Sequence, residues 1–174
     1  GTILRLPMVY GPGDYQHRLR AYLKRMDDGR PAIVLDARQV AWRDTRGYVE
    51  DVAAAIALAA TDSRASGRIY NVGEPDPRSE ADWVRAIGQA AGWPGTVACV
   101  EADRLPEALR ADGNVDQEFV VDTSRIRSEL GYIEPTAPAD ALSRTVAWER
   151  ANPPRSEDPA AFDYAAEDAV LRSL

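Results

Sequence analysis

The side chains that most often carry proton or group transfer are sparse in this chain. Its 174 residues include one histidine (His17), one cysteine (Cys99) and one lysine (Lys24), against twenty arginines. Cys99 and His17 cannot supply the four ligands of a structural zinc site, so we expect no metal centre. His17 stands between polar neighbours, where we expect a solvated residue at a helix start rather than a general base. No acid and base pair can be chosen from the spacing of the carboxylates, and we assign no catalytic residue.

A group of arginines ahead of a predicted helix is the best candidate for binding. Arg38, Arg43 and Arg46 share their stretch with Trp42 and Tyr48. Guanidinium groups hold phosphate or carboxylate with two parallel hydrogen bonds, so this group could bind an anionic part of a substrate. The alternative is structural, because the same arginines could form ion pairs with nearby carboxylates, namely Asp36, Asp44 or Glu50.

The glycines near the N-terminal end do not complete a nucleotide-binding motif. Gly11 and Gly13 offer the first part of a dinucleotide-binding turn, but Gln16 stands where its third glycine would be. No glycine-rich loop leads into Lys24, so a phosphate loop is also excluded. We expect these glycines to shape a turn.

Composition narrows the class of partner. A net charge of -7 and a pI near 4.8 repel nucleic acid and anionic membrane surfaces, so we expect neither partner. No apolar run approaches 18 residues, and the lone cysteine fits a reducing, cytoplasmic setting. The length suits one ordinary domain with its own core.

Strands and helices alternate along the chain and must position the candidate residues. Apolar runs bounded by turn residues predict strands at 2–6 with 8–10, 32–35, 40–42, 68–72, 96–100 and 118–121. Periods of three and four predict helices at 16–26, 49–60, 79–91, 123–131 and 139–150, with a last short helix after 159. This alternation predicts an α/β fold with a smaller mixed part after residue 74.

Four stretches resemble, in order, the motifs of NAD-dependent epimerase/dehydratases, the extended branch of the short-chain dehydrogenase/reductase superfamily. They read LRLPMVYGPGD at 4–14, RGYVEDVA at 46–53, IYNVG at 69–73, and DTSRI at 122–126 with LGY at 130–132. The resemblance covers residues 4 to about 150 and implies the C-terminal half of such an enzyme. The implied fold is the last two parallel strands of a Rossmann-type sheet plus a small mixed α/β substrate-binding lobe.

The resemblance also implies boundaries and ligands. Residues 1–74 would belong to the nucleotide-binding sheet with inserted substrate-lobe elements, 75–152 to the substrate-binding lobe, and 153–174 to a C-terminal tail with a short helix. Leu6, Pro7, Met8 and Val9 would lie along the nicotinamide end of NAD or NADP. The substrate, a small molecule such as a sugar derivative, would meet Met8, Arg43, Arg46 and Tyr48.

One of these positions departs from the family pattern. Many members that act on nucleotide sugars have an asparagine where this chain has Met8. A methionine cannot donate the hydrogen bond that the amide gives to a diphosphate, which counts against a nucleotide-sugar substrate.

The family's catalytic Tyr-x-x-x-Lys pair is missing, because Arg20 stands four residues before the only lysine, Lys24. The resemblance therefore implies an oxidoreductase or isomerase portion that is inactive alone. The first strand would lack neighbours, so we expect it to be covered by a missing N-terminal half or by a homo-oligomer partner. The alternatives are a non-catalytic ligand-binding or protein-interaction module, and an inert remnant.

Overall fold

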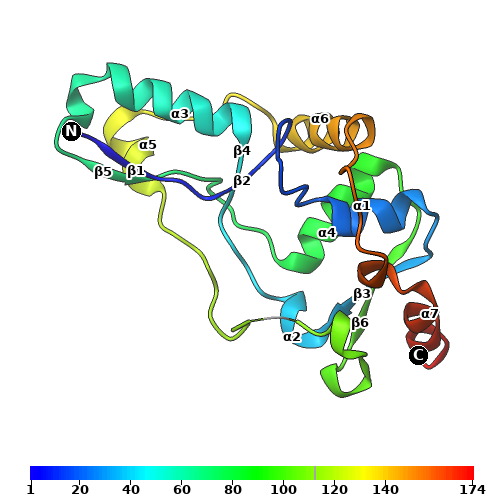
Figure 1. The fold of residues 1–174 in the computed structure, drawn as a ribbon. Helices are drawn as coiled ribbons and strands as arrows, with labels where there is room; N and C mark the ends of the chain where they lie inside the picture. Colours follow the sequence, from blue (N-terminus) through cyan, green and yellow to red (C-terminus); the bar gives the residue numbers. More distant parts are fainter. Residues whose placement is uncertain (112) are drawn as a thin grey trace.

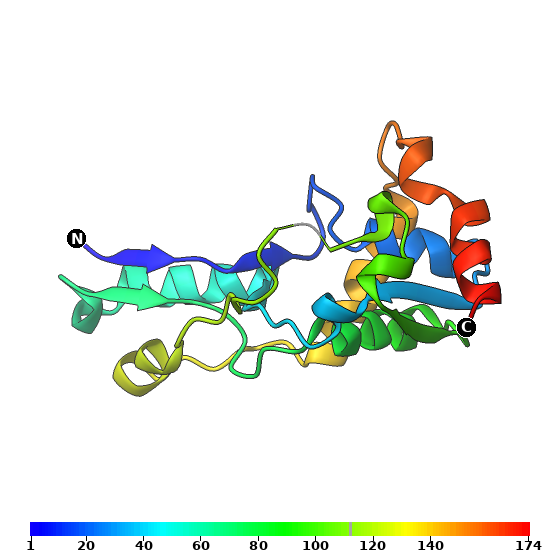
Figure 2. The same ribbon diagram turned by 90° about the horizontal axis from the view of Figure 1, so that it is seen from below.

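The computed structural model describes residues 1–111 and 113–174 and has two lobes (Figure 1). The first lobe contains β1 (Ile3–Arg5), β5 (Ile69–Asn71), α3 (Val49–Thr61) and α5 (Ser124–Leu130). The second contains β3 (Ala32–Asp36), β6 (Thr96–Val100), α1 (Arg20–Asp27), α2 (Ala37–Val40), α4 (Glu80–Ala91), α6 (Pro138–Ala151) and α7 (Tyr164–Arg172). Strands β2 (Met8–Tyr10) and β4 (Arg46–Tyr48) lie between the lobes, which form the two ends of an elongated molecule (Figure 2).

Short 3₁₀ turns connect these elements. They are η1 (Ser63–Ala65), η2 (Ala102–Arg104), η3 (Glu107–Leu109) and η4 (Pro159–Phe162). Among the described residues, no helix has the length and apolar composition needed to cross a membrane.

Every pairing between the named strands is parallel. β1 pairs with β5, β2 with β4, and β3 with β6. Parallel neighbours need a crossover connection, which the intervening helices supply. The β1–β5 pair runs in register from Ile3↔Ile69 to Arg5↔Asn71 and confirms the parallel pair expected from 2–6 and 68–72. The chain is therefore an α/β protein with Rossmann-type parallel strands.

The strands predicted at 40–42 and 118–121 are both wrong. A short helix that ends at residue 40 replaces the start of the first one, and a side-chain cap explains that helix. Residues 37–40 form α2 because the Asp36 carboxylate accepts a hydrogen bond from the Arg38 backbone N–H at 2.9 Å. At 118–121 the structure has an isolated bridge between Asp44 and Phe119 instead of a strand. The helix predicted from residue 16 begins at Arg20, because turns occupy the residues before it.

Two apolar clusters hold the lobes. In the second lobe Leu23, Val84 and Ile87 are fully buried where α1, α4 and α6 pack together. In the first lobe Ala55 and Ile126 are fully buried between α3, α5 and β5. Each large aliphatic side chain buried in this way contributes about 1.5–3 kcal/mol. Because the two clusters are separate, each lobe has its own apolar core, whereas the length alone predicted one core for the chain.

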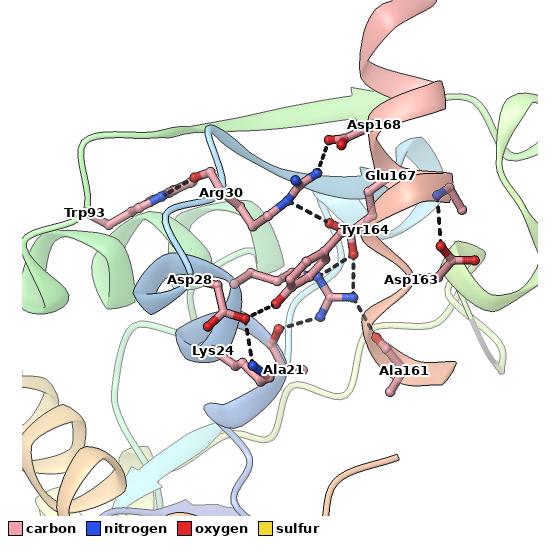
Figure 3. A network of polar contacts seen from close by, with 12 residues as sticks. Ala21, Lys24, Asp28, Arg30, Trp93, Ala161, Asp163, Tyr164, Glu167 and Asp168 are labelled. Atoms are coloured by element: carbon pink, nitrogen blue, oxygen red, sulfur yellow. Dashed lines mark hydrogen bonds and ion pairs between the residues drawn. The ribbon is translucent and has the colours of Figure 1, made fainter. Parts of the chain in front are cut away.

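The last helix, α7, docks on α1 through buried ion pairs (Figure 3). The Arg25 Nε–H donates to Glu167 Oε1 at 2.7 Å, and Arg30 Nε lies 3.6 Å from Glu167 Oε2. The Tyr164 hydroxyl donates to the Asp28 carboxylate at 2.5 Å. These contacts fix the C-terminal segment to the second lobe.

Candidate functional site

The chain passes from one strand pair to another at Pro7, where the two lobes meet. The Val72 N–H still donates to the Arg5 carbonyl at 2.9 Å, whereas the Met8 N–H donates to the Thr45 carbonyl at 3.3 Å. Proline has no N–H to pair, so it suits the residue between the two ladders.

Two glycines let Pro7 pack against the neighbouring backbone. A Cβ on Gly47 would lie 2.8 Å from Pro7 Cγ, and a Cβ on Gly73 would lie 3.3 Å from Pro7 Cβ. Pro7 is thereby fixed, while Leu6 and Met8 on either side remain 49% and 38% exposed. The segment 6–9 thus presents two apolar side chains at the lobe junction.

Arg46, the first residue of β4, is buried in a network of charges. Its Nη2 lies 2.8 Å from Asp44 Oδ1 and 2.5 Å from Glu80 Oε2. Its guanidinium carbon lies 4.5 Å from the centre of the Trp83 ring, which is a cation–π contact. The Tyr22 hydroxyl donates to the other oxygen of Glu80. Side chains from α1, α4 and the β4 region therefore hold this guanidinium in place.

Burial determines the protonation of this network. It raises the pKa of Asp44 to about 6, Arg46 opposes the rise, and Glu80 adds to it. Burial and then the Glu80 carboxylate also raise the pKa of Tyr22, which stays a protonated donor. At neutral pH two carboxylates therefore face one guanidinium.

A cleft of about 400 Å³ lies over this network. Aromatic rings form much of its wall, and amides and charged groups supply the polar positions. The lining residues are Met8, Tyr10, Gln16, Arg18, Ala21, Tyr22, Gln39, Trp42, Arg46, Glu80 and Trp83. Concave sites with aromatic walls and a few fixed polar groups are typical of small-molecule binding.

The second arginine of the cleft wall is also paired. Arg18 Nη1 donates to Asp14 Oδ1 at 2.5 Å and to the Val9 carbonyl at 3.0 Å. Asp14 is itself 8% exposed. Arg18 therefore holds the turn that follows β2 against the strand.

Of the candidate residues, the structure brings Met8 and Arg46 into one cleft. Leu6, Pro7 and Val9 flank Met8 along the chain. Tyr48 is not among the cleft residues, because its ring is buried against Tyr10 with centroids 5.8 Å apart.

The ion pairs expected as the structural alternative are present for all three candidate arginines. Arg38 pairs with Asp36, and Arg46 pairs with Asp44. Both carboxylates are among the partners that the sequence predicted. Exposed Arg43 instead pairs with Glu118, its Nε and Nη2 lying 2.7 and 2.8 Å from the two carboxylate oxygens. This partner could not be foreseen because it lies 75 residues away.

Sequence reasoning missed most of the cleft wall. Tyr22 belongs to a helical apolar stripe, and Glu80 stands in the first turn of α4, where an acid has a local explanation. Trp83 belongs to the apolar core, where it packs edge-on against Tyr10 with centroids 5.0 Å apart. Its second role, as cleft wall, carries no sequence signal.

His17 and Lys24 lie outside this cleft. The expectation of a solvated His17 is wrong, since its Nδ1 lies 2.8 Å from the fully buried Glu149 and its ring stacks on Trp148. Lys24 donates to Asp28 at 2.7 Å on its own helix. Among the residues the structure describes, no group of three or more histidine, cysteine or acidic side chains is arranged to hold a metal ion.

Comparison with known proteins identifies a family. Residues 1–73 match the model of the NAD dependent epimerase/dehydratase family. A dTDP-glucose 4,6-dehydratase of Streptomyces griseus is 34% identical over 151 residues, which cover 84% of this chain and 42% of the relative. A second one, from an Actinoplanes species, is 29% identical over 153 residues, covering 87% and 44%. The chain spans less than half the length of these curated relatives.

Solved structures show the same fold. A UDP-glucose 4-epimerase of Thermotoga maritima, crystallised with UDP-glucose, superposes with a TM-score of 0.64 at 21% identity, covering 86% of this chain and 46% of that one. A UDP-glucuronic acid 4-epimerase of Bacillus cereus, crystallised with NAD, gives 0.62 at 18% identity, covering 86% and 44%. With its motifs in the family's order, its parallel strand pairs and these matches, the chain belongs to the NAD-dependent epimerase/dehydratase family.

Proposed function

We propose that this chain is the substrate-binding, C-terminal portion of an NAD(P)-dependent epimerase, dehydratase or reductase, and that its cleft holds the sugar part of the substrate. The observation that carries the proposal is that Met8 and Arg46, from two separate family motifs, line the same cleft. The solved relatives that were crystallised with UDP-glucose or UDP-glucuronic acid support a sugar derivative as the substrate class.

The residues present fit one edge of a nicotinamide cofactor. Leu6 and Met8 are exposed at the lobe junction, where a ring could lie against them, and Pro7 keeps their backbone rigid. The complete glycine-rich turn that would hold a pyrophosphate is not in this sequence. We therefore propose that residues 6–9 contribute to the NAD or NADP site and that the rest of that site is supplied from elsewhere.

Proton and hydride transfer would also come from outside the chain. Lys24 is engaged with Asp28, and no tyrosine stands four residues before it. A missing N-terminal half or another subunit would carry the catalytic pair. Cys99, which is exposed and unpaired, supports a reducing, cytoplasmic setting.

The test is a calorimetric titration of the chain with UDP-glucose. Ala21 lies in the cleft wall, so Ala21→Phe fills space that the ligand needs and should weaken binding at least about tenfold. Ala57→Phe is the matched control, because Ala57 is exposed on α3 in the other lobe. Equal affinities for the wild type and both variants would show that UDP-glucose binds elsewhere, and absence of binding to the wild type would contradict the proposal.

A further inference from the structure

We infer that a second pocket, which shares only Tyr10 with the cleft among the described residues, binds a small zwitterion of the size of a free aliphatic amino acid. This inference goes beyond the proposed function and does not depend on it. The pocket has a volume of about 590 Å³ and lies between the first turn of α3, the loop 74–78 and the start of α6. Figure 1 shows the segment between α5 and α6 passing the N-terminal end of α3 at this place.

Hydrogen bonds hold the walls of the second pocket in position. The Tyr10 hydroxyl donates to Glu74 Oε1 at 2.9 Å and so ties the loop 74–78 to the end of β2. The Thr136 N–H donates to Asp51 Oδ1 at 3.1 Å, and the Tyr132 hydroxyl donates to the Asp51 backbone carbonyl at 2.9 Å. The pocket is therefore formed before any ligand arrives, which lowers the entropic cost of binding.

Arg78 gives this pocket a cation that has no partner. Among the described residues its guanidinium forms no ion pair and no hydrogen bond, and its Nη1 is buried. A buried donor without an acceptor is unfavourable. A carboxylate on a ligand can give a guanidinium two parallel acceptors, so Arg78 is suited to an anionic group.

Two carboxylates of the same pocket also lack a cationic partner. Asp51 is 5% exposed and Glu74 is partly buried, and neither forms an ion pair with another described residue. Burial raises the pKa of Glu74, while the Tyr10 hydroxyl and Arg78 oppose the rise. Arg78 thus lies near enough to Glu74 to act on its charge, yet the two groups do not pair. An ammonium group beside Asp51 and Glu74 would be attracted to both.

The two kinds of unpaired charge decide which class of ligand fits. A simple anion would meet the carboxylates, a simple cation would meet Arg78, and a neutral molecule would leave both signs unpaired. The carboxylates among the described residues are not arranged to hold a metal ion. Prolines and alanines supply the remaining surface, namely Pro75, Ala137, Pro138 and Ala141. A short apolar body that carries one ammonium and one carboxylate matches all of these features.

Calorimetric titration of the chain at neutral pH tests the inference with L-leucine and two analogues that each lack one charge. Isocaproate lacks the ammonium group, and isoamylamine lacks the carboxylate. We expect L-leucine to bind at least about tenfold more tightly than either analogue, because each analogue loses one charge-assisted contact. An analogue that binds as tightly as L-leucine would overturn the inference, since one of the two charges would then contribute nothing.

A variant places the ligand in this pocket. Arg78→Met removes the guanidinium and keeps an apolar stem, so it should weaken L-leucine binding at least about tenfold without weakening isoamylamine binding. Arg85→Met is the matched control, because Arg85 is exposed on α4, pairs with Asp82 and lies outside the pocket. Equal L-leucine affinities for the wild type and Arg78→Met would overturn the inference. The analogue series uses the wild type and decides the question if the Arg78 variant does not fold.

A last titration separates this pocket from the cleft. L-leucine should bind with its affinity changed by no more than about threefold when UDP-glucose is present at saturation, because the two sites share only Tyr10 among the described residues. Loss of L-leucine binding under these conditions would place it in the cleft and overturn the inference. Absence of L-leucine binding to the wild type would also overturn it and leave the proposed function intact. Failure of UDP-glucose to bind would contradict the proposed function, and the L-leucine series would still decide this inference.

Discussion

At the scale of single residues, Arg43 and Arg46 show how similar side chains three positions apart acquire different roles. Arg43 is exposed, and its guanidinium group pairs with the exposed carboxylate of Glu118. Arg46 is 5% exposed, contacts Asp44 and Glu80 at once, and stacks on Trp83. The sequence could nominate both arginines but could not distinguish them, because the distinction depends on residues brought in from α4.

Arg46→Lys should lower the free energy of unfolding by about 2–4 kcal/mol. A lysine ammonium is a single point charge and cannot reproduce the contacts of the planar guanidinium with both carboxylates and the ring. Arg43→Lys is the matched control and should change stability by less than about 1 kcal/mol, since its ion pair is exposed to solvent. Urea unfolding of both variants measures the difference, and equal losses would contradict the buried network.

At the scale of elements, periodicity predicted the helices better than it predicted the strands. The structure confirms the helices predicted at 49–60, 79–91 and 139–150 as α3, α4 and α6. The Ser79 side chain caps α4 by accepting a hydrogen bond from the Asp82 N–H. The failures at 40–42 and 118–121 arose from short apolar runs without enough periodicity to separate strand from turn. The docking of α7 could not be predicted from the sequence either, because its partners Arg25 and Arg30 precede it by more than a hundred residues.

Glu167→Gln should release α7 from α1. Glu167 is 1% exposed and faces Arg25 and Arg30, so its loss leaves the buried Arg25 without its carboxylate, whereas Arg30 keeps its contact with Asp168 (Figure 3). Removing one member of a buried ion pair costs about 3–5 kcal/mol. Hydrogen exchange of the α7 amides should accelerate accordingly.

The control for this variant is Asp168→Asn in the same helix. Asp168 contacts Arg30 but its side chain is 43% exposed, so we expect a loss of at most about 1 kcal/mol. If both substitutions accelerated α7 exchange equally, or neither did, the buried Glu167 pair would not be what holds the helix.

At the scale of the whole molecule, the chain has two cores, a cleft beside their junction and an open strand edge. β1 pairs with β5 on one side, while Ile3 and Leu6 remain 55% and 49% exposed. Such an edge invites pairing with another strand, so association through β1, with a missing half or a second copy, remains a prediction. The family motifs predicted the parallel pair, but not the cleft, whose walls come from α1, α2, α4 and both central strands.

The central claim is that the cleft holds the sugar part of the substrate, and NMR of the tryptophan indoles during a titration with UDP-glucose as the probe tests it most directly. Trp42 and Trp83 line the cleft, whereas Trp93 bonds to the Arg30 carbonyl and Trp148 stacks on His17. We predict saturable shifts of the Trp42 and Trp83 indole signals, with those of Trp93 and Trp148 unchanged. Unchanged signals from Trp42 and Trp83 at saturating UDP-glucose, or shifts confined to the other two, would contradict the claim.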